Sequence, residues 1–393
     1  MPDNSSTQSG GSVAVSFDSV ESLAFANGAP QLAATLKQEF EDFQVDEQLG
    51  FKLTGKGEHL YLRIEKTDLS TIEVAKKLSE VSGVPKSAIG YSGMKDRRAE
   101  TRQWFSLKLP QNRAEQLSAF ENDSVQIVAS ERNSRKLKIG SHRSNHFKIL
   151  LRNCEGDRGE FEERLHQIVS HGVPNYFGTQ RFGRDLSNLH QVQAWMSVEL
   201  DPGATGVADN RATPIVKQRF KRGMLFSAAR SYLFNQLLSR RLVLGSWDKY
   251  VEGDVLNLDG TERCFALASA AEWDESLQQR LTDFDIHITG PLPGEIDSKD
   301  KYVSYGKAAD IEDAVCEQFP TLLAGLKHFG VKAARRPLRF RPIDLRWQWL
   351  ESGDSGGKST SGAGNLSLDF SLAKGVYATS LLRELCVTRE HGQ

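Results

Sequence analysis

The 393-residue sequence lacks any run of about 18 apolar residues, the length that a membrane-spanning helix needs. Its first residues, MPDNSSTQSGGS, have neither a basic start nor an apolar core, which excludes a secretory signal peptide. Cysteine is scarce: Cys154, Cys264, Cys316 and Cys386 stand far apart, which argues against a disulfide framework and a zinc site. With 39% hydrophobic and 26% charged residues, the chain is not collagenous, coiled-coil or disordered. We expect a soluble, cytoplasmic protein of about two to three domains.

The net charge of −1 hides a strong segregation of charge along the chain. Residues 132–152 contain seven Lys or Arg and no acid, and residues 332–346 contain six against one. Residues 217–222 add four cations, whereas residues 251–320 carry sixteen acids and five bases. One basic run is usually a solvated surface, but several runs interleaved with aromatics such as Phe147 are typical of an RNA-binding surface. No basic run carries a lipid-facing apolar stripe, so we expect RNA and no membrane as partner.

The spacing of apolar residues predicts mixed strands and helices. Ser70 and Glu73 stand at the spacing of a capping box and predict a helix from Thr71, with Ile72, Ala75, Leu78 and Val81 on its inner face. Period-two alternation predicts strands at 40–49, 59–67, 103–109, 125–130 and 146–153. This order of elements favours an α+β sheet over a doubly wound nucleotide-binding fold.

Composition divides the chain into segments. Residues 1–27 are rich in Ser, Gly, Asn and Asp and are expected to form a flexible tail. The character of the sequence changes near residue 174 and reverses near 330, which indicates a domain at 174–330 inserted between two parts of another, 28–173 and 331–393. Later elements are expected to be helices at 223–243, 311–330 and 378–386, a basic strand at 335–347 and a flexible Gly/Ser loop at 352–365.

Two segments carry chemistry that could serve a reaction. Residues 93–98 (GMKDRR) place the lone carboxylate of Asp96 in a glycine turn among cations, which should lower its pKa and keep it ionised, as a nucleophile or base requires. The alternative is a salt-bridged surface acid. Residues 176–183 (YFGTQRFG) alternate aromatics with Arg181 and could stack a base and bind phosphate, or form a packed hinge. No phosphate-binding, metalloprotease or hydrolase motif is present, so we expect no cofactor and no metal.

Several long segments together resemble the tRNA pseudouridine synthase D family (TruD), in its bacterial form. In chain order they are GYSGMKDRRAETRQWFSL, NHFKILLRN, VPNYFGTQRFG, RGMLFSAARSYLFNQLLSRR and YATSLLRELC. The resemblance runs from Leu36 to Cys386. It implies an α+β fold: a pseudouridine synthase catalytic domain, with a mixed, mainly antiparallel sheet flanked by helices and an inserted α/β TRUD domain. It also implies an isomerase that converts uridine to pseudouridine at position 13 of tRNA.

The resemblance implies roles for individual residues. Asp96 would be the catalytic aspartate, and Phe147 would stack on the flipped-out uracil. Asn145 would hydrogen-bond near the carboxylate or the target nucleotide. Phe43 and Lys37 match an N-terminal motif that contributes to the same pocket.

The sequence departs from the family pattern at a few places. Phe40 stands where the family often has proline, which weakens the placement of Lys37, and Ser92 and Met94 replace the commoner Ala and Leu. The segment RDLSNL lacks a frequent glycine. None of these changes removes a group that the reaction needs.

Arg181 is the last candidate for substrate binding, and tRNA is the one partner indicated, with no protein partner. A different class of function remains open at this stage: a tRNA chaperone that folds or clamps RNA without isomerising it. A metal-dependent RNA-processing enzyme is disfavoured because no ligand cluster is present.

Overall fold

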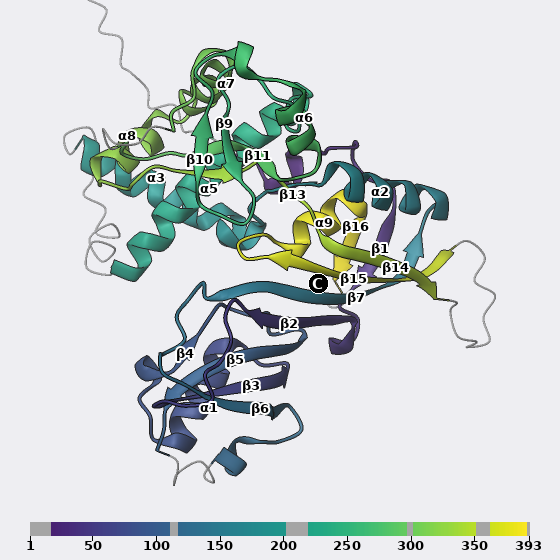
Figure 1. Ribbon diagram of the computed structural model, residues 1–393, viewed down its shortest axis with the longest axis vertical. Coiled ribbons are helices and arrows are strands. Elements are labelled where there is room, and N and C mark those ends of the chain that lie inside the picture. Colours follow the sequence, from purple (N-terminus) through teal and green to yellow (C-terminus); the bar gives the residue numbers. More distant parts are fainter. Residues whose placement is uncertain (1–16, 111–116, 202–218, 297–301, 351–361, 391–393) are drawn as a thin grey trace, which may run out of the picture.

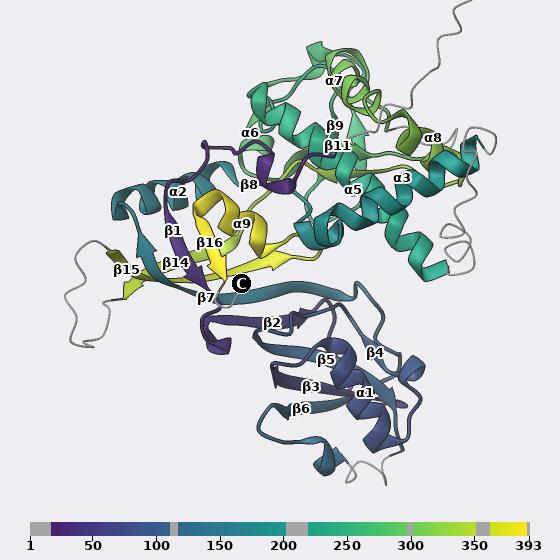
Figure 2. The ribbon, with the colours of Figure 1, turned by 180° about the vertical axis from the view of Figure 1, so that it is seen from behind.

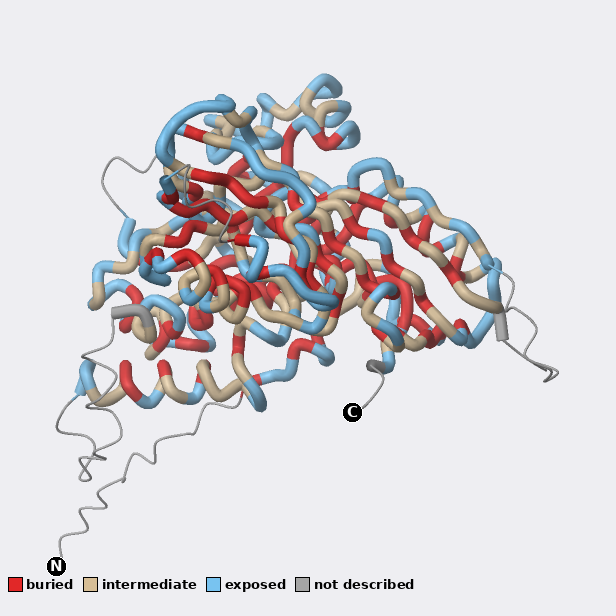
Figure 3. The backbone as a smooth tube through the Cα atoms, turned by 90° about the horizontal axis from the view of Figure 1, so that it is seen from below, coloured by how far each residue is buried: buried red, intermediate tan, exposed pale blue. Residues whose placement is uncertain are grey.

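The computed structural model describes residues 17–110, 117–201, 219–296, 302–350 and 362–390. The first part of the chain and its last part share one large curved sheet, and a second region of helices and a small sheet lies beyond one side of it (Figure 1). Buried segments run through both regions and are flanked by exposed loops (Figure 3). Within the described ranges, no helix is long and apolar enough to cross a bilayer.

The large sheet has one main path of seven strands. Along the main path the strands follow the order β14 (Ile343–Leu350), β15 (Gly362–Ala373), β7 (His142–Glu155), β2 (Phe43–Leu49), β5 (Glu100–Lys108), β3 (His59–Thr67) and β6 (Val125–Asn133). Neighbours on this path are antiparallel except β2 and β5, which are parallel. β4 (Gly90–Tyr91) pairs with β5, and β1 (Ala33–Leu36) pairs with β7 and, in parallel, with β16 (Val387–Glu390). The expected α+β fold with a mainly antiparallel sheet is confirmed.

Helices cover one face of this sheet in two groups. α1 (Thr71–Ser82) packs with β3 and β5 in one core cluster, while α2 (Arg158–His171) and α9 (Ala378–Leu385) pack with β7 and β15 in another. The capping box of α1 forms as expected, because Ser70 and Glu73 each accept the other's backbone N–H. The buried face of α1 is centred on Val74, Ala75 and Leu78, so it is turned from the expected one, and Ile72 and Val81 are half-buried.

The inserted region contains the long helix α5 (Arg219–Val243), against which α3 (Ser187–Leu200), α7 (Gly306–Cys316) and α8 (Pro320–His328) pack, and the shorter α6 (Glu275–Thr282). Its sheet has the order β10 (Cys264–Ala266), β9 (Val255–Leu258), β11 (Ile286–Leu292) and β12 (Ala334–Pro337). The single helix expected at 311–330 is two helices, because Pro320 lacks the N–H that a continuous helix needs and instead begins α8.

The boundaries of the insertion follow from the pairing of two short strands. The chain leaves the region of the large sheet at β8 (Val173–Pro174) and returns to it at β13 (Arg339–Phe340), and these strands pair with each other. The insertion therefore extends beyond the expected boundary at 330, because β12 belongs to its sheet. The sequence could not place this boundary, because the basic run at 332–346 continues without a change of composition from β12 through β13 into β14. Within it, Arg335 pairs with Glu312 of the insertion.

Residues 17–29, called the N-terminal strap here, cross from the insertion to the region of the large sheet (Figure 2). Phe17 and Leu23 are buried in the core of the insertion. Farther along, the Ala26 N–H donates to the carboxylate of Glu384 on α9, at 2.9 Å. The strap thereby contacts both regions of the molecule.

The expectation of a flexible tail over 1–27 is wrong for residues 17–27. The apolar residues of this segment are too scattered to show the spacing of a helix or a strand. They are nevertheless buried, because they pack against parts of the chain that are distant in sequence. Residues 1–16, most of the Gly/Ser loop (351–361) and the first two residues of the basic segment 217–222 lie outside the described residues.

Candidate active site

Asp96 lies in the loop of residues 92–99 between β4 and β5, called the Asp96 loop here. Its side chain is 38% exposed, and its Oδ2 accepts a hydrogen bond from Lys37 Nζ at 2.9 Å. Lys37 itself is buried, with a left-handed backbone φ of 56° directly after β1. A buried ammonium thus holds one oxygen of a carboxylate that solvent can reach.

A second lysine supports the backbone of Asp96. Lys66 lies on β3 and is 1% exposed, and its Nζ donates to the carbonyl oxygen of Asp96 at 2.9 Å and to that of Leu69. Burial lowers the pKa of Lys66 to about 8. Carbonyl oxygens and a nearby carboxylate are the partners that a buried lysine needs, and here they include the peptide that carries Asp96.

The rest of the Asp96 loop is held by buried polar groups. Lys95 pairs with Glu47 of β2 at 2.8 Å, with both side chains buried, and burial raises the pKa of Glu47 despite this cation. The Lys95 N–H donates to Thr71 Oγ1 at 2.9 Å, at the first residue of α1. Gln103 of β5 donates to the Gly93 carbonyl. Strand, helix and loop are therefore joined around one peptide segment.

Three of the cations near Asp96 in sequence have acidic partners of their own. They pair with other acids: Lys95 with Glu47, Arg97 with Asp68, and Arg102 with Glu65. Asp96 itself pairs with Lys37, which lies 59 residues earlier in the chain. Side chains of consecutive residues in a turn point in different directions. Closeness in sequence therefore could not show which cation contacts Asp96.

Aromatic rings continue from the Asp96–Lys37 pair across the sheet. Lys37 Nζ lies 4.3 Å from the centre of the Phe43 ring, and Phe43 meets Phe147 edge to face at 6.1 Å. Phe147 in turn stacks on Phe370 of β15 at 5.4 Å. Phe147 is 8% exposed, so most of its surface belongs to the core.

Asn145 lies two residues before Phe147 on β7, and therefore on the same face of the sheet. It is opposite Glu47 on β2 and Leu372 on β15. Among the described residues, its buried Oδ1 has no hydrogen-bond partner, which leaves an acceptor available for a ligand group.

Arg181 occupies a different place, at the junction of the insertion and α9. It donates to the Tyr377 hydroxyl at 2.7 Å and to the Ser227 hydroxyl at 3.1 Å, and its guanidinium lies over the Phe177 ring. The structure therefore groups Lys37, Phe43 and Phe147 with Asp96, whereas the described contacts of Arg181 are with this junction.

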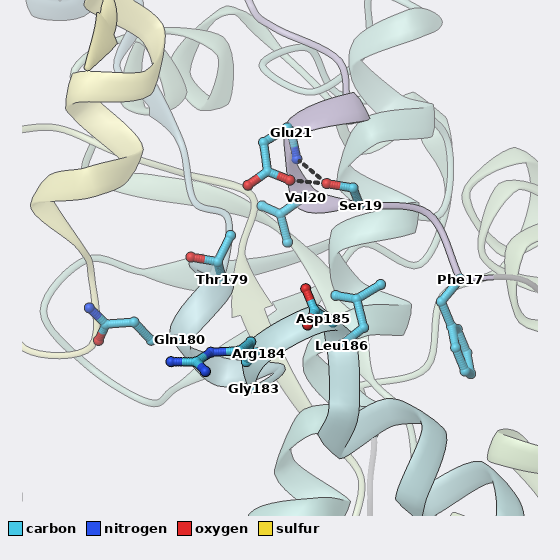
Figure 4. A pocket seen from close by; sticks show the side chains of 10 residues that line it. All are labelled: Phe17, Ser19, Val20, Glu21, Thr179, Gln180, Gly183, Arg184, Asp185 and Leu186. Atoms are coloured by element: carbon cyan, nitrogen blue, oxygen red, sulfur yellow. Dashed lines mark hydrogen bonds between the residues drawn. The ribbon is translucent and has the colours of Figure 1, made fainter. Parts of the chain in front are cut away.

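A hollow of about 730 Å³ lies beside this junction, between the N-terminal strap and residues 179–186 (Figure 4). Glu21 and Ser19 of the strap lie on one side, and Gln180 and Arg184 on the other. A smaller polar hollow, lined by Gln38, Glu39, Phe40, Asp68, Arg97 and Arg98, adjoins the Asp96 loop. Within the described ranges, no group of three or more His, Cys, Asp or Glu residues is placed to hold a metal ion.

Two supporting residues were missed, although the sequence contains a signal for them. In β3 the alternation Leu60, Leu62, Ile64 leads to Lys66, and in β2 Phe43 and Val45 lead to Glu47. A charge at the next buried position of a period-two strand must have a partner, which marks it as part of a polar site.

Comparison with known proteins agrees with this architecture. The sequence model of the family "tRNA pseudouridine synthase D (TruD)" matches residues 19–199 and 208–385. A tRNA pseudouridine synthase D of Hydrogenovibrio crunogenus is 36% identical over 93% of this chain and 96% of its own. One from Xanthomonas campestris is 40% identical over 92% of this chain and 94% of its own.

A crystal structure from Methanosarcina mazei, assigned in its description to tRNA pseudouridine synthase D, has the same fold. Its TM-score is 0.71 and its identity 21%, over 93% of this chain and 96% of that chain. The sequence relatives and the matched family model span both the region of the large sheet and the insertion, and the chain belongs to the tRNA pseudouridine synthase D family.

Proposed function

We propose that this protein is an isomerase that converts uridine to pseudouridine at position 13 of tRNA, with Asp96 as the reacting carboxylate. The observation that carries the proposal is the solvent-accessible Asp96 carboxylate with Lys37 Nζ at 2.9 Å. The family and the names of its relatives support tRNA as the substrate class. tRNA modification of this kind belongs to the cytoplasm.

The chemistry assigns a task to each residue of the site. The uracil must leave its stack before its glycosidic bond can be reached, which costs a few kcal/mol. Stacking of the flipped uracil on an aromatic side chain offsets this cost by about 1–3 kcal/mol. Phe147 is the ring we assign to this role, and its contacts with Phe43 and Phe370 fix its position. The unpaired Asn145 Oδ1 is the acceptor we assign to the target nucleotide.

Asp96 acts on the nucleotide as an anion, either by adding to the base or sugar or by removing a sugar proton. Lys37 holds Oδ2, so Oδ1 is the oxygen we assign to the reaction. The detached uracil rotates and rejoins the sugar through carbon 5, and the proton on that carbon is lost. Arg181 is the residue we assign to a tRNA contact near the junction, because its chain neighbours Thr179 and Gln180 line the hollow of about 730 Å³.

The test uses bulk tRNA from cells that lack this protein. The tRNA is incubated with the wild type, with Asp96→Asn, or with Asp310→Asn, which changes an exposed aspartate on α7. Pseudouridine is then mapped by carbodiimide labelling and primer extension. We expect a new stop at position 13 with the wild type and Asp310→Asn, and none with Asp96→Asn, while tRNA affinity stays within about twofold because one carboxamide replaces one carboxylate.

Full activity of Asp96→Asn would remove Asp96 from the reaction. A new stop at another position would correct the site while leaving the reaction in place. If the wild type bound tRNA in a salt-dependent way yet formed no pseudouridine, the chaperone function would replace the enzymatic one.

A further inference from the structure

Three loops meet where the Asp96 loop begins, at Ser92. The Gly140 N–H donates to the Ser92 carbonyl at 2.7 Å, which joins the loop before β7 to the Asp96 loop. The Gly50 N–H donates to the Ser141 carbonyl at 3.3 Å, which joins the loop after β2 to the same place. The ends of β2, β4 and β7 are therefore one connected edge.

Each of these loops exposes a large apolar side chain within two residues of these hydrogen bonds. Ile139 is 79% exposed, Met94 is 61% exposed and Phe51 is 39% exposed. The three residues are called the apolar rim here. Met94 stands two residues before Asp96, so a nucleotide that reaches the carboxylate comes close to this side chain.

The apolar rim is held in place. The Asp96 loop is fixed on both sides of Met94, through Gly93 and Lys95, and Phe51 packs edge to face on Tyr61 at 6.3 Å. Apolar side chains on such fixed loops lose contact with water only when a partner covers them. A partner is therefore expected at this edge.

The charges around the apolar rim select the kind of partner. Arg135, Lys138 and Arg143 are exposed in the segment that contains Ile139, and residues 132–152 contain no acid. Lys374 is also exposed, and its N–H donates to the Arg143 carbonyl at 3.2 Å. Apolar side chains among cations fit a polyanion with exposed flat faces, which is RNA with an unstacked base.

We propose that the apolar rim packs against the base next to the target uridine in tRNA, taking the stacking place that the uridine leaves when it flips out. This inference rests on the proposed function and adds a second contact to it. Phe147 receives the flipped uracil, and Met94 and Ile139 cover the neighbour left behind. Base unstacking is stabilised by apolar side chains in the same way in other nucleic-acid complexes.

The experiment crosses a protein change with an RNA change. The double variant Met94→Ser/Ile139→Ser is compared with the wild type on intact tRNA and on tRNAs with an abasic nucleotide 5′ or 3′ of the target uridine. On intact tRNA we expect kcat/KM to fall by about tenfold, the size of one lost base-stacking contact. On one of the abasic tRNAs we expect the two proteins to differ by less than about twofold, because the contacted base is already gone.

Val243→Ser serves as the matched control, since Val243 at the end of α5 is 69% exposed. It should leave kcat/KM unchanged on every RNA, and thermal melting of each variant checks the fold. An undiminished loss on both abasic tRNAs, or no loss on intact tRNA, would overturn the proposal. If the wild type itself formed no pseudouridine, the proposed function would fail instead, so the two failures are separable.

Discussion

Lys66 holds a buried position in β3 that the alternation of the strand would otherwise give to an apolar side chain. Its ammonium contacts the backbone of Asp96 and not the carboxylate, so we assign it a positioning role. A buried charge with fixed partners defines the direction of the peptide that carries Asp96. Misplacement of a reacting group by about 1 Å can cost 100-fold in rate, so this support has a measurable effect.

We expect Lys66→Met to lower kcat by about 10- to 100-fold while KM for tRNA stays within about twofold, because the substrate surface is unchanged. Steady-state kinetics measure this split. Lys76→Met is the matched control, since Lys76 is 69% exposed on α1. A rise in KM with unchanged kcat would contradict the positioning role.

The same residue predicts a pH dependence of stability. The folded pKa of Lys66 is about 8, below its ordinary value of 10.5, because burial disfavours the charge. Between these values the unfolded chain binds the proton more tightly, so the free energy of unfolding rises with pH, by up to about 3 kcal/mol. Lys66→Met should lose this rise. Urea unfolding of both proteins at pH 7.5 and pH 10 measures how much the free energy of unfolding changes with pH. An equal change in the wild type and in Lys66→Met would refute the prediction.

At the scale of elements, the turn that precedes α3 carries two consecutive left-handed residues that are not glycine. Asp185 has φ 52° and ψ 39°, and Leu186 has φ 57° and ψ 24°. Side chains with a Cβ are strained there by about 1–2 kcal/mol each. This is the segment RDLSNL, so backbone strain is present directly before α3.

Asp185 is exposed, so Asp185→Gly should relieve backbone strain without removing core contacts. We expect the free energy of unfolding to rise by about 1 kcal/mol, seen as a higher urea midpoint at constant slope. Asp185→Ala is the control and should not stabilise, because it keeps the Cβ. A glycine variant less stable than the wild type would contradict this prediction. It would show that the Asp185 side chain stabilises the fold by more than the backbone strain costs.

Local signals explain which elements the sequence predicted well. The expected strand at 59–67 is β3, and the capping box at Ser70 begins α1, because both depend on neighbours in sequence. The Asp96–Lys37 pair could be expected only from the family resemblance, since 59 residues separate the partners. The packing of Arg181 against Tyr377 depends on the docking of two regions, which no local pattern encodes.

At the scale of the whole molecule, the N-terminal strap joins the two regions. Phe17 is 9% exposed and meets Tyr232 of α5 at 5.1 Å and Phe319 at 6.2 Å between ring centres. Phe17→Ala should therefore lower the free energy of unfolding by about 3 kcal/mol. Guanidinium unfolding measures it, with the exposed-site change Glu21→Ala as control. An effect below about 1 kcal/mol would mean that the strap is not part of the folded core.

The parallel pairing of β1 with β16 has a consequence for synthesis on the ribosome. Ala33 pairs with Val387 and Leu36 with Glu390, so β1 cannot form this pairing until residues 354 positions later in the chain have been made. Lys37 follows β1 directly, and its contact with Asp96 depends on where that strand comes to rest. The nascent chain therefore cannot complete this edge of the sheet until residues 387–390 have left the ribosome, and the position of Lys37 beside Asp96 depends on that late pairing.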